Sequence, residues 1–247
     1  MAVGFDAASE SHTGTTGSVS AATFSWTHAG GAGPKGALVA IMNSSDDQDI
    51  ISGVTINSVA MTAVSGGAVG TPNTGEQGYV KWYHLGTYAT AGNVTVEVTR
   101  TNNTNELWAV SITTTAGGGM DTAVHTAGIV TTSSTSSTFV EQSVDDGSPG
   151  TNSMRFGAAH FGHISPPAAG ANSTMLHSID YGARGGAVCR ETTAGQGSRS
   201  VGFSVGGSDD VAAVYFAVKE TAAAGGSAFM KLAGSRFSLA GHSGLAA

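Results

Sequence analysis

Two histidines, His160 and His163, are the residues best suited by type and spacing to bind a metal ion. Further candidate ligands follow at His177, Asp180 and Cys189. On a β-strand, residues three apart point to opposite faces of the sheet, so the two histidines converge on one ion only if the chain turns near Gly162. We therefore expect histidines at a strand edge or in a loop, with no metal and no cofactor.

Three acidic loops could bind a hard cation such as Ca²⁺, because each clusters oxygen ligands. These loops are residues 43–49, Asp145-Asp146-Gly147 and Asp209-Asp210. None has the spacing of an EF-hand loop. Carboxylates that are merely adjacent, such as Asp46 and Asp47, also do not form the acid/base pair that glycoside hydrolysis requires. We expect solvated acidic turns and assign no catalytic residue.

Two further motifs have plain structural interpretations. The segment GAGPKG (31–36) matches G-x-G-x-x-G by its letters, but it precedes a strand and contains Pro34, whereas a dinucleotide-binding loop follows a strand and opens a helix. It is predicted to be a glycine-rich loop. Cys189 is the lone cysteine, and its place in the run GAVCRETT predicts a buried structural thiol.

Four aromatic residues could form a flat platform for a sugar: Tyr79, Trp82, Tyr83 and Trp108. Their positions within alternating strands favour packing in a core or between subunits instead. Loops rich in Gly, Ser and Thr could still bind a glycan.

The elements that carry these residues are predicted to be short strands, about a dozen in all, separated by turn residues. In NVTVEVT (93–99) valines alternate with polar residues, which predicts one buried face. In ALVAIM (37–42) and VAAVYFAV (211–218) both alternating sets are apolar, which predicts strands covered on both faces. The run VTINSVAMT (54–62) predicts a tight hairpin with Asn57 in its turn.

These patterns predict an all-β protein. We expect a jelly-roll-like antiparallel β-sandwich over residues 1–220 and an extended C-terminal arm over residues 221–247. The low-complexity segment TTSSTSST (131–138) is interpreted as a loop that crosses the sandwich, with a domain linker as the alternative.

The arm is the segment for which the sequence favours a function. Residues 1–220 hold all 17 acidic residues and eight of the ten basic ones, a net charge of −9, whereas the arm holds Lys231 and Arg236, a net charge of +2. Such a segment could add to a sheet edge or fill grooves on a partner, while the alternative is a disordered terminus. The predicted docking residues are spaced apolar anchors: Phe229, Met230, Leu232, Phe237, Leu239 and Leu245.

The composition of the chain argues against two classes of partner, nucleic acids and membranes. An acidic body should repel nucleic acid. The first residues lack the basic and apolar regions of a signal peptide, and no apolar run approaches the roughly 18 residues of a membrane span. We expect synthesis in a host cytoplasm and no membrane partner.

Several phrases resemble a recurrent β-rich domain of structural proteins from tailed bacteriophages and environmental viruses. They are SWTH (25–28), ALVAIMN (37–43), GVTINSVAMTAV (53–64), VKWYHLG (80–86), NVTVEVT (93–99) and VAAVYFAVKE (211–220). The resemblance covers about residues 3–220 and does not extend to the arm. It implies a jelly-roll-like sandwich displayed on a virion.

Together these observations predict a non-enzymatic virion structural protein: a capsid decoration, head-fibre or tail-associated protein. It is expected to form a homo-oligomer and to dock on capsid proteins or neighbouring subunits through the arm. The first alternative is a carbohydrate-binding adhesin of the jelly-roll type, and the second is a glycan-degrading enzyme.

Overall fold

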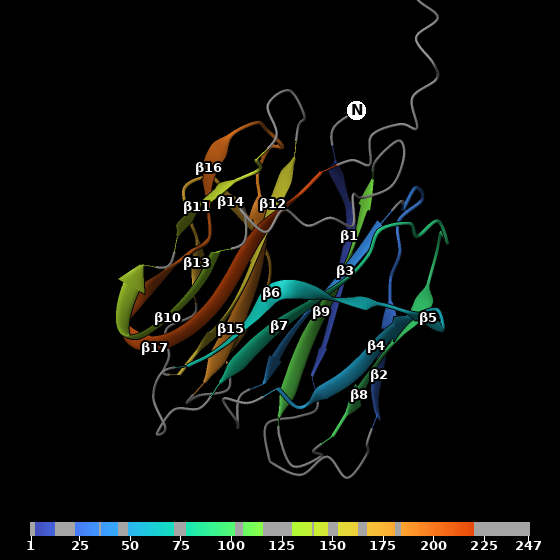
Figure 1. Ribbon diagram of the computed structural model, residues 1–247, viewed down its shortest axis with the longest axis horizontal. Helices are drawn as coiled ribbons and strands as arrows, with labels where there is room; N and C mark the ends of the chain where they lie inside the picture. Colours follow the sequence, from blue (N-terminus) through green and yellow to red (C-terminus); the bar gives the residue numbers. More distant parts are fainter. Residues whose placement is uncertain are drawn as a thin grey trace, which may run out of the picture.

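A computed structural model describes residues 3–12, 23–34, 36–43, 49–71, 78–101, 106–115, 130–139, 141–147, 153–162, 167–180 and 184–219. These residues form antiparallel strands and no helix (Figure 1). They accordingly include no helix with the length and apolar character needed to cross a membrane. The predicted all-β class and β-sandwich architecture are confirmed.

The described residues of the first half form nine strands. They are β1 (Gly4–His12), β2 (Thr23–His28), β3 (Gly36–Asn43), β4 (Ile51–Ile56), β5 (Val59–Ala60), β6 (Thr62–Gly70), β7 (Tyr79–Leu85), β8 (Val94–Arg100) and β9 (Leu107–Thr115). Five of them form a sheet in the order β1-β9-β3-β7-β6, called inner sheet 1, and four form outer sheet 1 in the order β2-β8-β4-β5.

The described residues of the second half form eight strands. They are β10 (Val130–Phe139), β11 (Gln142–Asp145), β12 (Met154–Phe161), β13 (Ala168–Ala169), β14 (Ser173–Asp180), β15 (Gly185–Glu191), β16 (Ser198–Val201) and β17 (Phe203–Val218). Inner sheet 2 has the order β10-β17-β12-β15-β14, with β13 also paired to β17, and outer sheet 2 is the pair β11-β16.

Each half is wound as a jelly roll, in which a long folded hairpin pairs the first strand with the last, the second with the next to last, and so on inward. In the first half β1 pairs with β9, β2 with β8 and β3 with β7. In the second half β10 pairs with β17, β11 with β16 and β12 with β15. The third strand of each half also pairs with the last, as β3 with β9 and β12 with β17. One winding therefore occurs twice in this chain.

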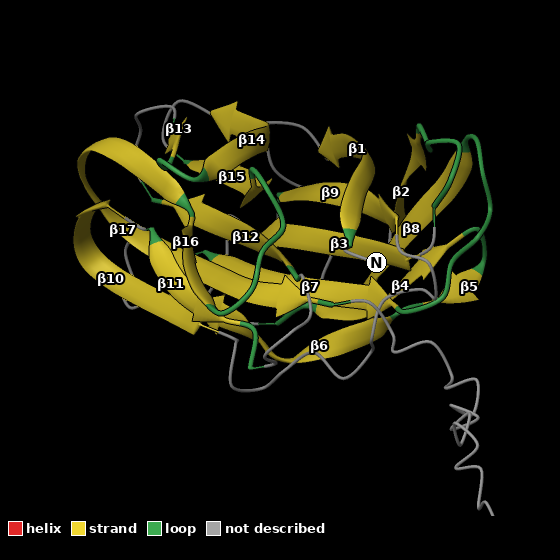
Figure 2. Ribbon diagram, turned by 90° about the horizontal axis from the view of Figure 1, so that it is seen from above, coloured by secondary structure: helices red, strands yellow, loops and turns green. Residues whose placement is uncertain are grey.

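The sheets stack with the two inner sheets facing each other, as the first-half strands at the right and the second-half strands at the left of Figure 1 show. Three apolar cores result. One joins outer sheet 1 to inner sheet 1, one joins the two inner sheets, and one joins inner sheet 2 to outer sheet 2. The interface between the inner sheets is called the seam below, and Figure 2 shows the layers from another side.

This stacking explains the two apolar runs. Along β3, Val39 and its alternate neighbours enter the core with outer sheet 1, while Leu38 and its neighbours enter the seam. Along β17, Tyr215 packs toward outer sheet 2 and Phe216 toward the seam. Strands with two buried faces are apolar at every position, so the predicted two-sided covering is confirmed.

The smaller predictions have mixed outcomes. In β8 the valines are buried and the alternate residues are not, as expected. The hairpin between β4 and β5 turns at Asn57 and Ser58, whose positive φ angles of 49° and 63° match the tight turn predicted there. The interpretation of residues 131–138 as a loop or linker is wrong, because they lie within β10 and pair with β17. The boundary predicted at residue 220 stays a prediction.

Candidate functional site

The predicted docking arm lies outside the described residues. This holds for all six anchors, Phe229, Met230, Leu232, Phe237, Leu239 and Leu245. Their role stays a prediction, and the described residues are the ones whose chemistry can be built from geometry.

Three of the four aromatic residues considered for sugar binding are core residues. Trp82 and Trp108 lie in the seam, and Tyr83 lies in the core between inner sheet 1 and outer sheet 1. Tyr79 is half-buried. Trp82 packs edge-on against Phe216 with ring centroids 4.9 Å apart. The packing role predicted for these rings is confirmed for the three buried ones.

The candidate metal ligands do not gather among the described residues, which contain no group of three or more His, Cys, Asp or Glu side chains able to hold an ion. His163 lies outside the described residues, and so do residues 44–48 of the first acidic loop. His177 pairs with Glu10 across the seam, with 3.2 Å between Nδ1 and Oε1. Cys189 is buried, and burial raises the pKa of its thiol far above its usual value. The predicted structural thiol is confirmed.

The second acidic loop has an internal role instead of the predicted solvated one. Asp145 accepts a hydrogen bond from the Gly147 amide at 3.0 Å, which caps a local turn. The Asp146 side chain is buried and accepts a hydrogen bond from the Ser153 hydroxyl at 2.9 Å. It also lies 3.8 Å from the guanidinium of Arg155. The interpretation as a solvated turn is therefore wrong for Asp146.

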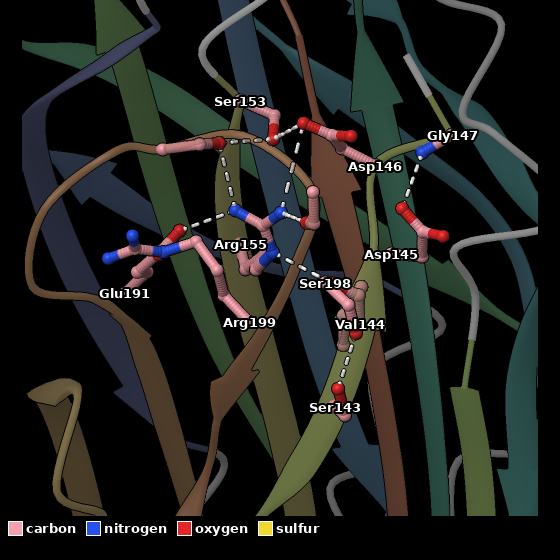
Figure 3. A network of polar contacts seen from close by, with 12 residues as sticks. Ser143, Val144, Asp145, Asp146, Gly147, Ser153, Arg155, Glu191, Ser198 and Arg199 are labelled. Atoms are coloured by element: carbon pink, nitrogen blue, oxygen red, sulfur yellow. Dashed lines mark hydrogen bonds and ion pairs between the residues drawn. The ribbon is translucent and has the colours of Figure 1, made fainter. Parts of the chain in front are cut away.

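Arg155 is the centre of this buried ionic cluster (Figure 3). It lies on β12 and its side chain is completely buried. Because Phe156 on the same strand faces the seam, Arg155 points to the opposite side, toward outer sheet 2. Its Nη1 donates to Glu191 Oε2 at 2.9 Å, and Glu191 on β15 is also completely buried. The Glu191 carboxylate also pairs with Arg199 on β16.

Backbone carbonyls complete the shell of Arg155. Nε donates to the Val144 carbonyl at 2.9 Å, Nη1 also donates to the Gly195 carbonyl at 3.2 Å, and Nη2 donates to the Gly197 carbonyl. A buried guanidinium is stable only when its charge and its N–H donors are matched in this way. The cluster ties β11, β12, β15 and the turn before β16 together, and its interior position gives it a structural role.

A second buried network surrounds His28 on β2. Its Nδ1 lies 2.9 Å from Ser111 Oγ and its Nε2 lies 3.2 Å from Thr113 Oγ1, both on β9. The Thr113 hydroxyl donates to Asp6 on β1 at 2.9 Å, and the Trp26 indole donates to Ser111 Oγ at 3.0 Å. These five residues form a continuous line of hydrogen bonds where β1, β2 and β9 meet.

The directions of these bonds determine the tautomer of His28. A carboxylate only accepts, so Thr113 donates to Asp6 and therefore accepts from Nε2–H of the imidazole. Nδ1 then carries no proton and lies 2.9 Å from the Ser111 hydroxyl, whose single proton is shared between this nitrogen and the Ser9 carbonyl at 3.2 Å. Burial lowers the pKa of His28, and the Asp6 carboxylate and the backbone of Ser111 partly offset this effect. Each ring nitrogen lies within hydrogen-bond distance of a hydroxyl oxygen.

A serine hydroxyl against a histidine nitrogen is also the arrangement of a nucleophile and its general base. Here the Ser111 side chain is completely buried, and its oxygen already accepts the indole N–H of Trp26. Because this oxygen is buried, a substrate carbonyl cannot reach it. The network therefore has a structural role, which is to join β1, β2 and β9. Sequence analysis missed both networks, although Arg155 within the apolar run MRFGAAHF was a visible signal.

Two contacts link the halves across the seam. Glu10 on β1 accepts from the Trp108 indole at 2.9 Å and pairs with His177 on β14. Arg190 on β15 lies over the Phe5 ring of β1, 4.9 Å from its centroid.

Comparisons of the chain with protein-family models, with curated proteins and with solved structures found no match.

Proposed function

We propose that this chain is a non-enzymatic structural protein of a virion, in the class of capsid decoration, head-fibre or tail-associated proteins. In this proposal the two jelly rolls form a rigid body. The arm, residues 221–247, docks that body on capsid proteins or on a neighbouring copy of the chain.

The repeated jelly-roll winding carries this proposal. Viral capsid proteins and lectins both use the jelly roll, so the winding supports a display or binding role by analogy of fold. The sequence phrases that resemble phage structural domains lie on strands of this winding, including β3, β7 and β17. The two buried networks add support, because their ionic and hydroxyl groups bond to one another inside the fold and so have a structural role.

Charge supports the docking role of the arm. The body has a net charge of −9 and the arm a net charge of +2, so an arm can be attracted to the acidic face of a neighbouring body. Its apolar anchors would then supply the register on the partner.

Deletion of residues 225–247 tests this function. The truncated protein is expected to fold with an unchanged far-UV circular dichroism spectrum and to be lost from purified particles, as measured by quantitative mass spectrometry of virions. A matched variant, Lys219→Ala, keeps the arm and should be incorporated normally. Normal occupancy of the truncated protein would refute the docking role.

A glycan array, probed with and without Ca²⁺, separates this proposal from the carbohydrate-binding alternative. A structural protein shows no saturable binding to any glycan. Saturable binding that survives deletion of the arm would establish the adhesin in its place.

A further inference from the structure

His160 is an anomaly in the seam. It is the seventh residue of β12, on the same face as Phe156 and Ala158, and its side chain is 1% exposed. Neither Nδ1 nor Nε2 has a hydrogen-bond partner in the part of the chain that the structure describes. Buried polar groups are nearly always hydrogen-bonded, and an unpaired one costs stability. A neutral ring can bear this cost, but a charged ring has no acceptor for its two N–H groups.

Residues at the edge of inner sheet 1 pack closely against this ring. Gly78, next to the start of β7, lies so close that a Cβ atom there would stand 2.0 Å from His160 Nδ1. Trp108 on β9 is similarly close to Gly186, the residue that pairs with His160 in inner sheet 2. The ring is thus held between the two jelly rolls, where any change in its charge or hydration acts on the seam.

Among the described residues, no carboxylate is a hydrogen-bond partner of the ring. Arg184, which precedes β15, acts on His160 electrostatically and opposes a positive charge there. On β17 the carbonyl of Asp210 accepts from the Gly162 amide at 2.8 Å, and Asp210 makes other interactions of its own. On the side of inner sheet 1, Gly78, the residue before β7, faces the ring and has no side chain. The Trp108 indole on β9 donates to Glu10 on β1.

Two other histidines belong to the seam. His84 lies on the same face of β7 as Trp82, near the other end of the strand, and burial lowers its pKa. His177 on β14 faces the carboxylate of Glu10. His177 therefore has a polar partner in the seam, whereas His160 has no hydrogen-bond partner among the described residues.

We propose that the seam is an acid-sensitive latch: it stays closed while His160 is neutral, and it opens when that ring takes up a proton. Opening exposes the apolar faces of both inner sheets and separates the two jelly rolls. This inference does not depend on the proposed virion function.

The direction of the pH effect follows from linkage. Burial and the charge of Arg184 lower the pKa of His160 from 6.5 to about 3 in the closed seam. A ring exposed to water regains a pKa near 6.5. The closed form is thus fully favoured above pH 6.5 and loses stability as the pH falls from 6.5 toward 3. For one proton the opening constant rises about 30-fold between pH 7.5 and pH 5.

Hydrogen exchange of the Trp82 indole N–H in the full chain tests the latch, because this group is buried in the seam and opening exposes it to water. In the wild type, its exchange, corrected for the intrinsic rate, should accelerate by about 30-fold between pH 7.5 and pH 5. In His160→Leu, which keeps an apolar side chain of similar size, the acceleration should be clearly smaller, and when His84→Leu is added it should be less than about threefold, because burial also lowers the pKa of His84. His177→Gln, a seam histidine with a partner, should retain the wild-type response. The same acceleration in His160→Leu and in the wild type would overturn the proposal.

A second measurement needs no variant and decides the matter if His160→Leu does not fold. The imidazole resonances of His160 in the folded wild type, followed by NMR, should not titrate between pH 7.5 and pH 5. A titration with a midpoint near 6.5 in the folded protein would show that the closed seam accepts the charged ring, and it would refute the latch.

Discussion

The two jelly rolls share one winding but stabilise it with different buried chemistry. In the first half the strands β1, β2 and β9 are joined by a line of neutral groups around His28, with the Asp6 carboxylate at its end. In the second half the strands β11, β12 and β15 are joined by the buried ions Arg155, Glu191 and Asp146. The same topology can therefore be stabilised by a buried line of hydrogen-bonded hydroxyls or by a buried ionic cluster.

The difference lies in what each network costs when it is incomplete. A hydroxyl that loses its partner leaves one unsatisfied group, whereas a guanidinium that is removed leaves unpaired carboxylates in a dry interior. The backbone carbonyl of Gly197 also accepts from Arg155, whereas that of Gly195 accepts from Ser153 as well. We therefore expect the second half to be more sensitive to single substitutions than the first.

The largest effect is expected for Arg155→Met. It leaves Glu191 and Asp146 buried with much of their compensation removed, and the free energy of unfolding should fall by about 3–5 kcal/mol. Urea denaturation measures this loss. The matched variant Arg199→Ala removes the other, partly exposed partner of Glu191 and should cost less than about 1 kcal/mol. Equal losses in the two variants would show that burial does not distinguish the two arginines.

His28→Leu makes the corresponding change in the first half. It deprives the hydroxyls of Ser111 and Thr113 of a partner, so the expected loss is up to about 3 kcal/mol, smaller than for Arg155. Ser25→Ala, on the exposed face of the same strand, should change stability by less than about 0.5 kcal/mol. Because burial lowers the pKa of His28, the wild type also loses stability as the pH falls below 6.5, and this part should be absent in His28→Leu.

Gly78→Ala probes the place where the halves meet. The new methyl group would overlap the His160 ring, so we expect a loss of about 2 kcal/mol through overpacking. Gly53→Ala on β4 is the control, since a Cβ atom there meets nothing within 4 Å. Its effect on the melting temperature should be neutral or slightly stabilising. A neutral Gly78→Ala would mean that the seam adjusts at little cost.

The smallest effect concerns the hairpin that closes outer sheet 1. Ser58 has a φ of 63°, a conformation that favours glycine, so Ser58→Gly should stabilise the first half by about 0.5 kcal/mol. Ser25→Gly, in an extended strand, should destabilise it instead. Thermal unfolding of both variants checks the opposite signs.

Much of the secondary structure was predictable from local patterns. The alternating valines of residues 93–99, the two-sided apolar runs on β3 and β17, and the turn at Asn57 each follow from a few adjacent residues. Residues 131–138 were misread because a run of Thr and Ser has no apolar period. Their strand identity comes from pairing with β17, far away in the chain.

The candidate sites were less predictable for the same reason. His28 bonds to Ser111, 83 residues away, and Arg155 to Glu191, 36 residues away. The spacing of His160 from His163 suggests a metal ligand, yet its importance lies in a buried ring that has no hydrogen-bond partner among the described residues.

The sequence by itself determined which apolar residues of the alternating and two-sided strands are buried, because alternation along a strand separates the two faces of a sheet. It also determined the charge contrast between the body and the arm. Only the tertiary structure decided which buried residues meet, since the nested pairing of each jelly roll and the stacking of the inner sheets join segments that are distant in the chain. That is why the ionic cluster, the line of hydrogen-bonded hydroxyls and the buried ring of His160 emerge from the folded chain alone.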